Sequence, residues 1–144
     1  MAPRFRHRGR VTADGPLIRV RIGHGESVRR ALSGTGLADP TIEVPALIDT
    51  GAMGTYLDGT VIDAIGLRAA RAAFEVQTAV GAPHLWDAYE VRVIFGEGYE
   101  LNVFGARLDE YALPGTRCIL GRDILRRRHL AYSGRTNSYV LELD

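Results

Sequence analysis

An apolar run that ends directly in an aspartate constrains the fold of this chain more than any other feature. Residues 46–48 read Ala-Leu-Ile, and this uniformly apolar pattern predicts the end of a fully buried strand. Asp49, Thr50 and Gly51 follow at once. A carboxylate that leaves a buried strand is held rigidly, and a glycine permits a tight turn that brings backbone amides toward it. Chemistry at Asp49 is one reading, and an Asx turn that only shapes a loop is the other.

A second motif lies far downstream, where residues 119–125 read Ile-Leu-Gly-Arg-Asp-Ile-Leu. The pattern predicts a short strand that ends at Gly121 and a helix over residues 122–128 with Ile124 and Leu125 turned inward. A glycine at the end of a strand allows another backbone to approach closely. By itself the motif reads as a strand, a turn and an amphipathic helix.

The rest of the chain reads as many short strands. Alternating or apolar runs predict strands over residues 17–22, 41–48, 74–80, 89–95, 99–104 and 117–120, and a final hairpin with arms 129–132 and 138–143. A helix is expected over residues 56–67, because Asp58 can cap its start and Gly66 can end it. Residues 23–40 are expected to form a long connection with a helical turn near residues 28–32. This order predicts a mainly-β, barrel-like domain.

Size and composition narrow the function classes. The 144 residues fit one domain, and a formal net charge of +1 gives no reason to expect a nucleic-acid partner. No apolar run is long enough to span a membrane and the basic N-terminus lacks the apolar stretch of a signal peptide, so a cytoplasmic protein is expected. Residues 1–14, with alternating arginines, are expected to be a flexible basic arm in front of a folded domain over residues 15–144. The single cysteine, Cys118, has apolar neighbours and is expected in the core.

The two motifs together resemble the aspartic proteases of retroviral type, the retropepsins, and the retropepsin-like proteins of bacteria. The resemblance implies a single-domain closed β-barrel, the acid protease fold, with one or two short helices. It also implies a homodimeric aspartic endopeptidase, because each subunit of that family contributes one Asp-Thr-Gly to a shared active site. Its substrates would be extended peptides or proteins, and neither a cofactor nor a metal would be required.

The same resemblance assigns roles to individual residues. Asp49 would activate a water, while Thr50 would hydrogen-bond across the two-fold axis to the opposite loop and Gly51 would shape the turn. The strand before Gly121 would pass beside the catalytic loop, so that Gly121, Arg122 and Asp123 would support it. Ala52 and a flap between two strands would bind the substrate, and the flap residues would be Val80, Gly81, Ala82 and Trp86. A flap of this kind grips an extended peptide by strand addition.

Two positions depart from the retroviral pattern. Retroviral members place carboxylates where this chain has Met53 and Gly54, and one of those carboxylates pairs with the arginine of the downstream helix. Arg122 is therefore expected to lack its partner. The final hairpin, in place of one terminal strand, could pair within its own subunit. A catalytically inactive module that binds peptides or proteins, and a purely structural dimerisation domain, remain as alternatives.

Overall fold

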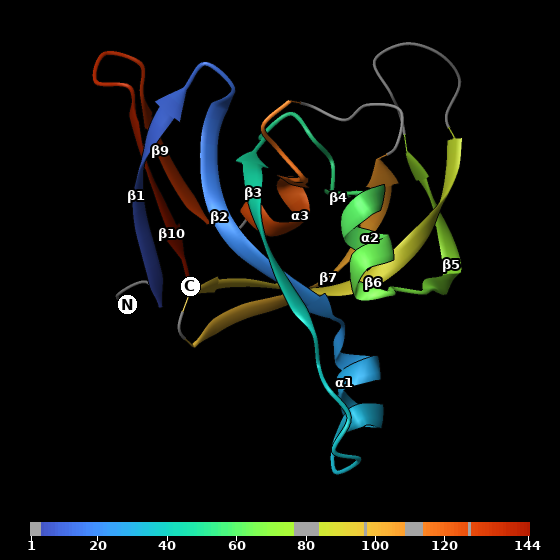
Figure 1. The fold of residues 1–144 in the computed structure, drawn as a ribbon. Coiled ribbons are helices and arrows are strands. Elements are labelled where there is room, and N and C mark those ends of the chain that lie inside the picture. Colours follow the sequence, from blue (N-terminus) through green and yellow to red (C-terminus); the bar gives the residue numbers. More distant parts are fainter. Residues whose placement is uncertain (1–3, 77–83, 97, 109–113, 127) are drawn as a thin grey trace.

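The strands of this chain close into a barrel in the computed structural model, which describes residues 4–76, 84–96, 98–108, 114–126 and 128–144, with the backbone alone over 70–76 and 84–86. Within these ranges six strands follow one another around the barrel, and the last pairs back with the first (Figure 1). They are β2 (Gly15–His24), β3 (Thr41–Ile48), β8 (Cys118–Leu120), β4 (Thr55–Asp58), β7 (Tyr99–Leu108) and β6 (His84–Gly96). The predicted mainly-β closed barrel is confirmed.

The period of two in the sequence places the core inside the barrel. In β2 the side chains of Ile18, Val20 and Ile22 are buried, whereas Arg19 and Arg21 between them are exposed. Alternation of this kind is what a strand with one face on the core requires. The other strands and α2 complete the core with apolar side chains that are at most 3% exposed, among them Val44, Ala46, Ile48, Leu57, Val61, Ile62, Val91, Val93 and Leu120.

Short helices join the strands, and within the described residues there are three, one more than the resemblance implied: α1 (Glu26–Leu32), α2 (Gly59–Ile65) and α3 (Arg122–Leu125). The helix expected over residues 56–67 begins later, because residues 55–58 pair with β7 and β8 as strand β4. Asp58 caps α2 as predicted, since its carboxylate accepts a hydrogen bond from the Thr60 amide at 2.8 Å. Gly66 ends α2 in the left-handed conformation with φ of 76°.

Residues 5–12 form a strand, although they were expected to belong to a flexible arm over residues 1–14. Strand β1 (Phe5–Thr12) pairs with β10 (Ser138–Leu143), and β10 pairs with β9 (His129–Ser133), in a sheet beside the barrel (Figure 1). The three arginines of β1 point to solvent, while Phe5 at its start packs against Phe95 and Tyr99. Exposed arginines thus alternate along β1 with residues that face inward and are held by tertiary contacts. The folded unit therefore includes residues before Gly15, and the final hairpin pairs within its own chain, as expected.

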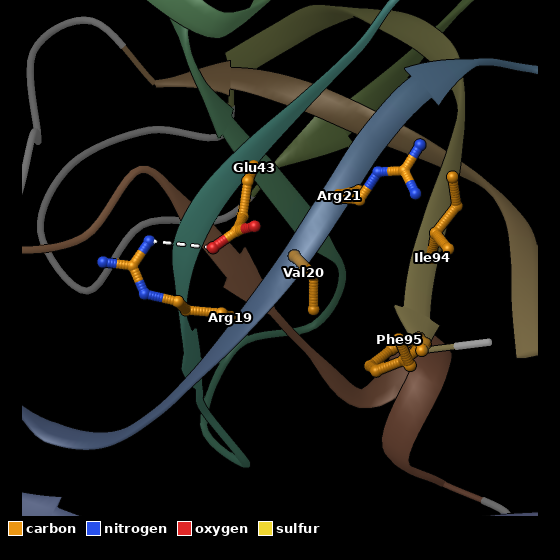
Figure 2. Close-up of a pocket in the computed structure, with 7 residues that line it drawn as sticks. Arg19, Val20, Arg21, Glu43, Ile94 and Phe95 are labelled. Carbon is orange, nitrogen blue, oxygen red and sulfur yellow. Dashed lines mark hydrogen bonds and ion pairs between the residues drawn. The ribbon is translucent and has the colours of Figure 1, made fainter.

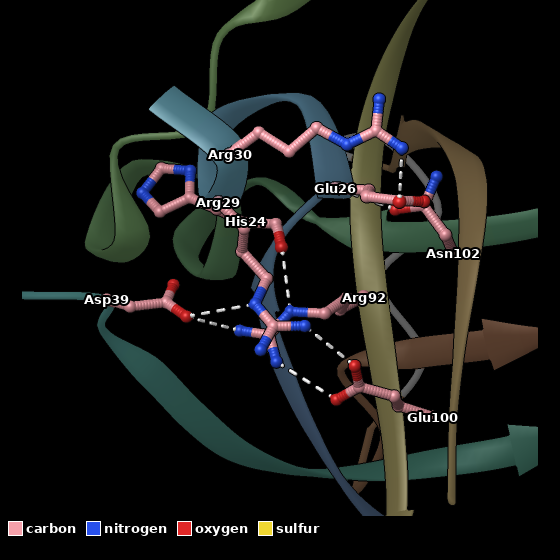
Figure 3. A network of polar contacts seen from close by, with 8 residues as sticks. All are labelled: His24, Glu26, Arg29, Arg30, Asp39, Arg92, Glu100 and Asn102. Carbon is pink, nitrogen blue, oxygen red and sulfur yellow. Dashed lines mark hydrogen bonds and ion pairs between the residues drawn. The ribbon is translucent and has the colours of Figure 1, made fainter. Parts of the chain in front are cut away.

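A network of charges attaches α1 to the barrel, as Figure 3 shows. Helix α1 has no buried side chain, so apolar packing does not hold it. Arg92 of β6 is only 6% exposed, and its guanidinium donates to Asp39 at 2.7 Å, to Glu100 at 3.0 Å and to the carbonyl of His24 at 3.0 Å. Arg29 of α1 reaches the same two carboxylates. A buried cation of this kind is stable only because its donors are satisfied.

Candidate functional site

The Asp-Thr-Gly segment lies where three neighbouring strands of the barrel meet. The chain leaves β3, passes through residues 49–54 and returns as β4, while β8 lies between the two, parallel to β3 and antiparallel to β4. Helix α3, which follows β8, is next to this loop (Figure 1). Two segments that are far apart in sequence, residues 49–54 and 119–123, are thus held together at one end of the barrel. The two sequence motifs meet in space.

Asp49 is fixed by the backbone on both sides. Its amide donates to the Leu120 carbonyl at 3.0 Å, which extends the pairing of β3 with β8, and its carbonyl accepts from the Ala52 amide at 3.2 Å. One carboxylate oxygen, Oδ1, accepts a hydrogen bond from the Gly51 amide at 2.8 Å. Among the described residues nothing hydrogen-bonds the other oxygen. Asp49 is half-buried, so a preorganised carboxylate has one oxygen left for a proton or a water.

The loop around Asp49 is open to solvent in a single chain. Thr50 and Gly51 are exposed and Ala52 is half-buried, while Met53 exposes 54% of its surface. Within the described part of the chain the Thr50 hydroxyl has no hydrogen-bond partner. The backbone of the segment is therefore held by hydrogen bonds, whereas its outer face is exposed to solvent.

Gly121 packs directly against the loop. A Cβ atom at Gly121 would lie 2.2 Å from the carbonyl oxygen of Gly54 and 2.7 Å from its carbonyl carbon, which no side chain can occupy. The expected close approach of two backbones at this glycine is present. The reverse is not true, because a Cβ atom at Gly54 would meet only Asp123 Oδ2, at 3.9 Å.

Asp123 ties β4 to α3. Its Oδ2 accepts hydrogen bonds from the Thr55 amide at 3.0 Å and from the Thr55 hydroxyl at 2.9 Å, and its Oδ1 accepts from the Ile124 amide at 2.9 Å. Thr55 is fully buried, so these bonds satisfy polar groups that water cannot reach. The carboxylate of this tether belongs to the downstream helix, and the donors belong to the strand after the loop. Loop and helix are therefore joined although Met53 and Gly54 supply no carboxylate.

Arg122 contributes its backbone to the site. Its amide donates to the Ala52 carbonyl at 2.9 Å. Its side chain is exposed, and no carboxylate of the described residues lies within ion-pair distance of the guanidinium. The Arg122 guanidinium is therefore without an ion-pair partner among the described residues.

Tyr56 is a site residue that sequence reasoning missed. Burial raises the pKa of its phenol, the negative charges of Asp123 and Asp49 raise it further, and the positive charge of Arg122 opposes them. The side chain is half-buried on β4, where Tyr56 is paired with Ile119 of β8. Sequence reasoning missed the position of Tyr56 because it assigned residues 56–67 to a helix. The alternation from Thr55 to Asp58 is the signal that could have placed it on a strand.

The expected flap falls largely outside the described residues. Strands β5 (Ala69–Val76) and β6 pair in antiparallel fashion up to Val76 and His84, so a hairpin does flank the segment. Val80, Gly81 and Ala82 lie outside the described residues. The backbone of Trp86 pairs with Phe74, and its side chain lies outside the described part of the structure.

Other groups in the described ranges show no second reactive centre. Cys118 is buried, and burial raises the pKa of its thiol far above the ordinary value, which makes it a poor nucleophile. Over the described residues no cluster of three or more His, Cys, Asp or Glu side chains could hold a metal ion. Across those same ranges no helix is both long and apolar enough to traverse a lipid bilayer.

Two surface cavities lie away from the loop. One, of about 300 Å³, lies between β2 and β6, and Figure 2 shows Arg19 paired with Glu43 at its edge. Arg21 beside it already bonds the Thr41 hydroxyl. The other, of about 420 Å³, lies between β3 and α2, where Arg117 bonds Thr60. In both cavities the arginine side chains already have hydrogen-bond partners, so neither cavity is a candidate catalytic site.

Comparisons with known proteins support the fold. No family model matches the sequence, and no curated protein matches it. Among solved structures the chain is similar to a retropepsin-like aspartic protease from Rickettsia conorii, with a TM-score of 0.53 and 15% sequence identity. The similarity covers 96% of this chain and 91% of that chain. The closed barrel with its crossed strands is therefore a retropepsin-like fold.

Proposed function

We propose that this chain is an aspartic endopeptidase that works as a homodimer. The observation that carries the proposal is the setting of Asp49. Its carboxylate stands at the end of buried strand β3, held by the Leu120 carbonyl through the backbone and by the Gly51 amide, with one oxygen uncommitted. The similarity to a retropepsin-like aspartic protease supplies the reaction class by analogy.

One chain has only half of the required chemistry. Hydrolysis of a peptide bond by carboxylates needs one that is ionised and one that is protonated, which a close pair achieves by sharing a proton. Asp123 cannot serve as the second, because Thr55 and Ile124 occupy its two oxygens. We infer that the second carboxylate is Asp49 of another copy. The exposed Thr50 hydroxyl is then free to bond across the two-fold axis.

The steps follow from this pair. The ionised carboxylate takes a proton from a water as the water oxygen attacks the peptide carbonyl carbon, while the protonated carboxylate donates to the carbonyl oxygen. The tetrahedral intermediate then collapses: the ionised carboxylate takes a proton from a hydroxyl of the intermediate as the carbonyl re-forms, the C–N bond breaks, and the protonated carboxyl gives its proton to the leaving amine nitrogen. The first shared proton is restored, so the pair ends as it began. The Gly51 amide keeps each carboxylate in position throughout.

A catalytically inactive binding module is the second candidate. Met53, 54% exposed beside Asp49, offers an apolar contact to a bound chain. The tether between Asp123 and Thr55 holds the loop whether or not catalysis occurs. Such a module would bind extended peptides without cleaving them.

The decisive experiment compares the wild type with Asp49→Asn in cleavage of a mixed peptide library from acidic to neutral pH. Asparagine keeps an acceptor for the Gly51 amide, so the loop should survive while ionisation is lost. Asp14→Asn, in an exposed turn, is the matched control for removal of a carboxylate. We expect cleavage by the wild type and by Asp14→Asn, and at least a hundredfold loss in Asp49→Asn.

Sedimentation at the assay concentration completes the design. Cleavage should rise with the square of protein concentration where monomers dominate, since two copies form one site. A sedimenting dimer that binds peptides but cleaves none would select the binding module. Equal cleavage by the wild type and Asp49→Asn would reject an aspartic mechanism.

A further inference from the structure

We propose that the Arg122 guanidinium forms a substrate subsite that selects peptides with an Asp or Glu side chain two or three residues from the scissile bond. The inference rests on the proposed function, because it concerns the peptide bound over Asp49. It adds a substrate class, acidic peptides, to the proposed activity.

Arg122 is attached to the loop that carries Asp49. Its amide bonds the Ala52 carbonyl at 2.9 Å, and the preceding residue, Gly121, lies against the backbone of Gly54. The side chain therefore starts beside the same loop that carries Asp49. A peptide placed over the Asp49 carboxylate would lie close to this loop.

The charge of Arg122 has no partner among the described residues. Some arginines of the described ranges, such as Arg6, Arg19 and Arg107, have carboxylate partners, whereas Arg122, like Arg8 and Arg10, is exposed and has none there. The neighbouring carboxylate of Asp123 is occupied by Thr55 and Ile124. A guanidinium without an internal partner is available to a ligand.

The positive charge of Arg122 acts on Tyr56, at the edge of the candidate site. Tyr56 responds to the negative charge of Asp49 and, in the opposite direction, to the positive charge of Arg122. Both charges therefore act on the same phenol at the edge of the site. Asp49 and Asp123 give this region negative charge. A carboxylate bound there would therefore need the positive charge of Arg122 as its partner.

An extended peptide has a regular spacing of side chains. Side chains two residues apart lie on one face of a strand, at about 6.8 Å from each other. A peptide that runs from the loop toward α3 would place one side chain over the loop and another, two or three residues farther along, near α3. The planar guanidinium binds carboxylates through two parallel hydrogen bonds, which favours Asp and Glu over their amides.

The first test measures selectivity rather than total activity. Peptides that differ only by Glu or Gln at each position from two to four residues on either side of the cleaved bond are compared by kcat/KM. We expect the wild type to prefer Glu about three- to tenfold at one position, as for a partly exposed charge pair. In Arg122→Gln that ratio should fall to about one. Arg126→Gln removes the same charge from the end of α3 and should leave the ratio unchanged.

A charge-reversal variant distinguishes a lost subsite from a simple loss of stability. Arg122→Glu should prefer Lys over Gln at the position where the wild type prefers Glu. A variant that had merely lost structure would lose activity on all peptides alike. A wild-type ratio of about one at every position, or a ratio that survives Arg122→Gln, would overturn the inference.

Binding separates this inference from the proposed function. Asp49→Asn binds peptides without turnover, so the dissociation constants of fluorescein-labelled Glu and Gln peptides can be measured by anisotropy. A Glu preference that needs Arg122, together with no cleavage by the wild type, would reject the protease and retain the subsite. Cleavage that depends on Asp49 but ignores Glu would retain the protease and reject the subsite.

Discussion

Asp123 accepts two hydrogen bonds from a single residue, Thr55, through its amide at 3.0 Å and its hydroxyl at 2.9 Å. Thr55 is fully buried at the start of β4, directly after the loop that carries Asp49. The carboxylate therefore fixes where the loop ends, just as the Leu120 carbonyl fixes where it begins. Met53 and Gly54 stand where the retroviral pattern has carboxylates, and here the carboxylate of the tether belongs to α3.

Removal of the tether should destabilise the protein. Asp123→Ala leaves the buried Thr55 amide without an acceptor, and we expect the free energy of unfolding to fall by about 1 to 3 kcal/mol. Asp123→Asn keeps one acceptor oxygen and should lose less. Urea denaturation of both variants measures the difference. Equal midpoints for Asp123→Ala and the wild type would show that another group satisfies Thr55.

The two touching glycines should respond differently to the same substitution. Gly121→Ala would place a Cβ atom 2.2 Å from the Gly54 carbonyl oxygen, and backbone cannot yield as a side chain can. We expect a loss of more than about 2 kcal/mol, or failure to fold. Gly54→Ala should be tolerated, because its Cβ atom would meet only Asp123 Oδ2, at 3.9 Å. Thermal unfolding of the pair checks this, and the opposite order would show that the loop packs differently.

Stability should fall in acid partly through His7, which matters for assays of an aspartic enzyme. His7 lies on the inward side of β1, with its ring 5.9 Å from that of Tyr139, and burial lowers its pKa below 6.5. The unfolded chain then binds a proton more readily than the folded one. The free energy of unfolding contributed by His7 is therefore present above pH 6.5 and is lost as the pH falls through the folded pKa.

His7→Phe removes this titration and keeps an aromatic ring on β1. Its free energy of unfolding should depend less on pH below 6.5 than that of the wild type, as measured by urea denaturation at several pH values. Parallel curves for the two proteins over this range would show that His7 is equally protonated in both states.

Much of the candidate site could be predicted from local patterns. Residues 46–52 and 119–125 carry both motifs in contiguous sequence, and the cap at Asp58 and the αL end at Gly66 depend only on neighbouring residues. Strand β1 could not be predicted from local sequence. Its arginines face solvent, and Phe5 is held by residues 90 or more positions away in the chain. The start of α2 was missed for the same reason: residues 55–58 become a strand through pairing with β7 and β8.

The sequence by itself determined that Asp49 follows a buried strand, that Gly121 ends another, and that the chain alternates as a β-barrel does. These are local properties, set by side-chain periodicity and by the conformational freedom of glycine. Only the tertiary structure decided that β8 lies between β3 and β4, that Asp123 holds Thr55, and that the charges of Asp49 and Arg122 both act on Tyr56. Such relationships depend on which distant segments the closing barrel brings into hydrogen-bonding distance, and no single stretch of sequence encodes that choice.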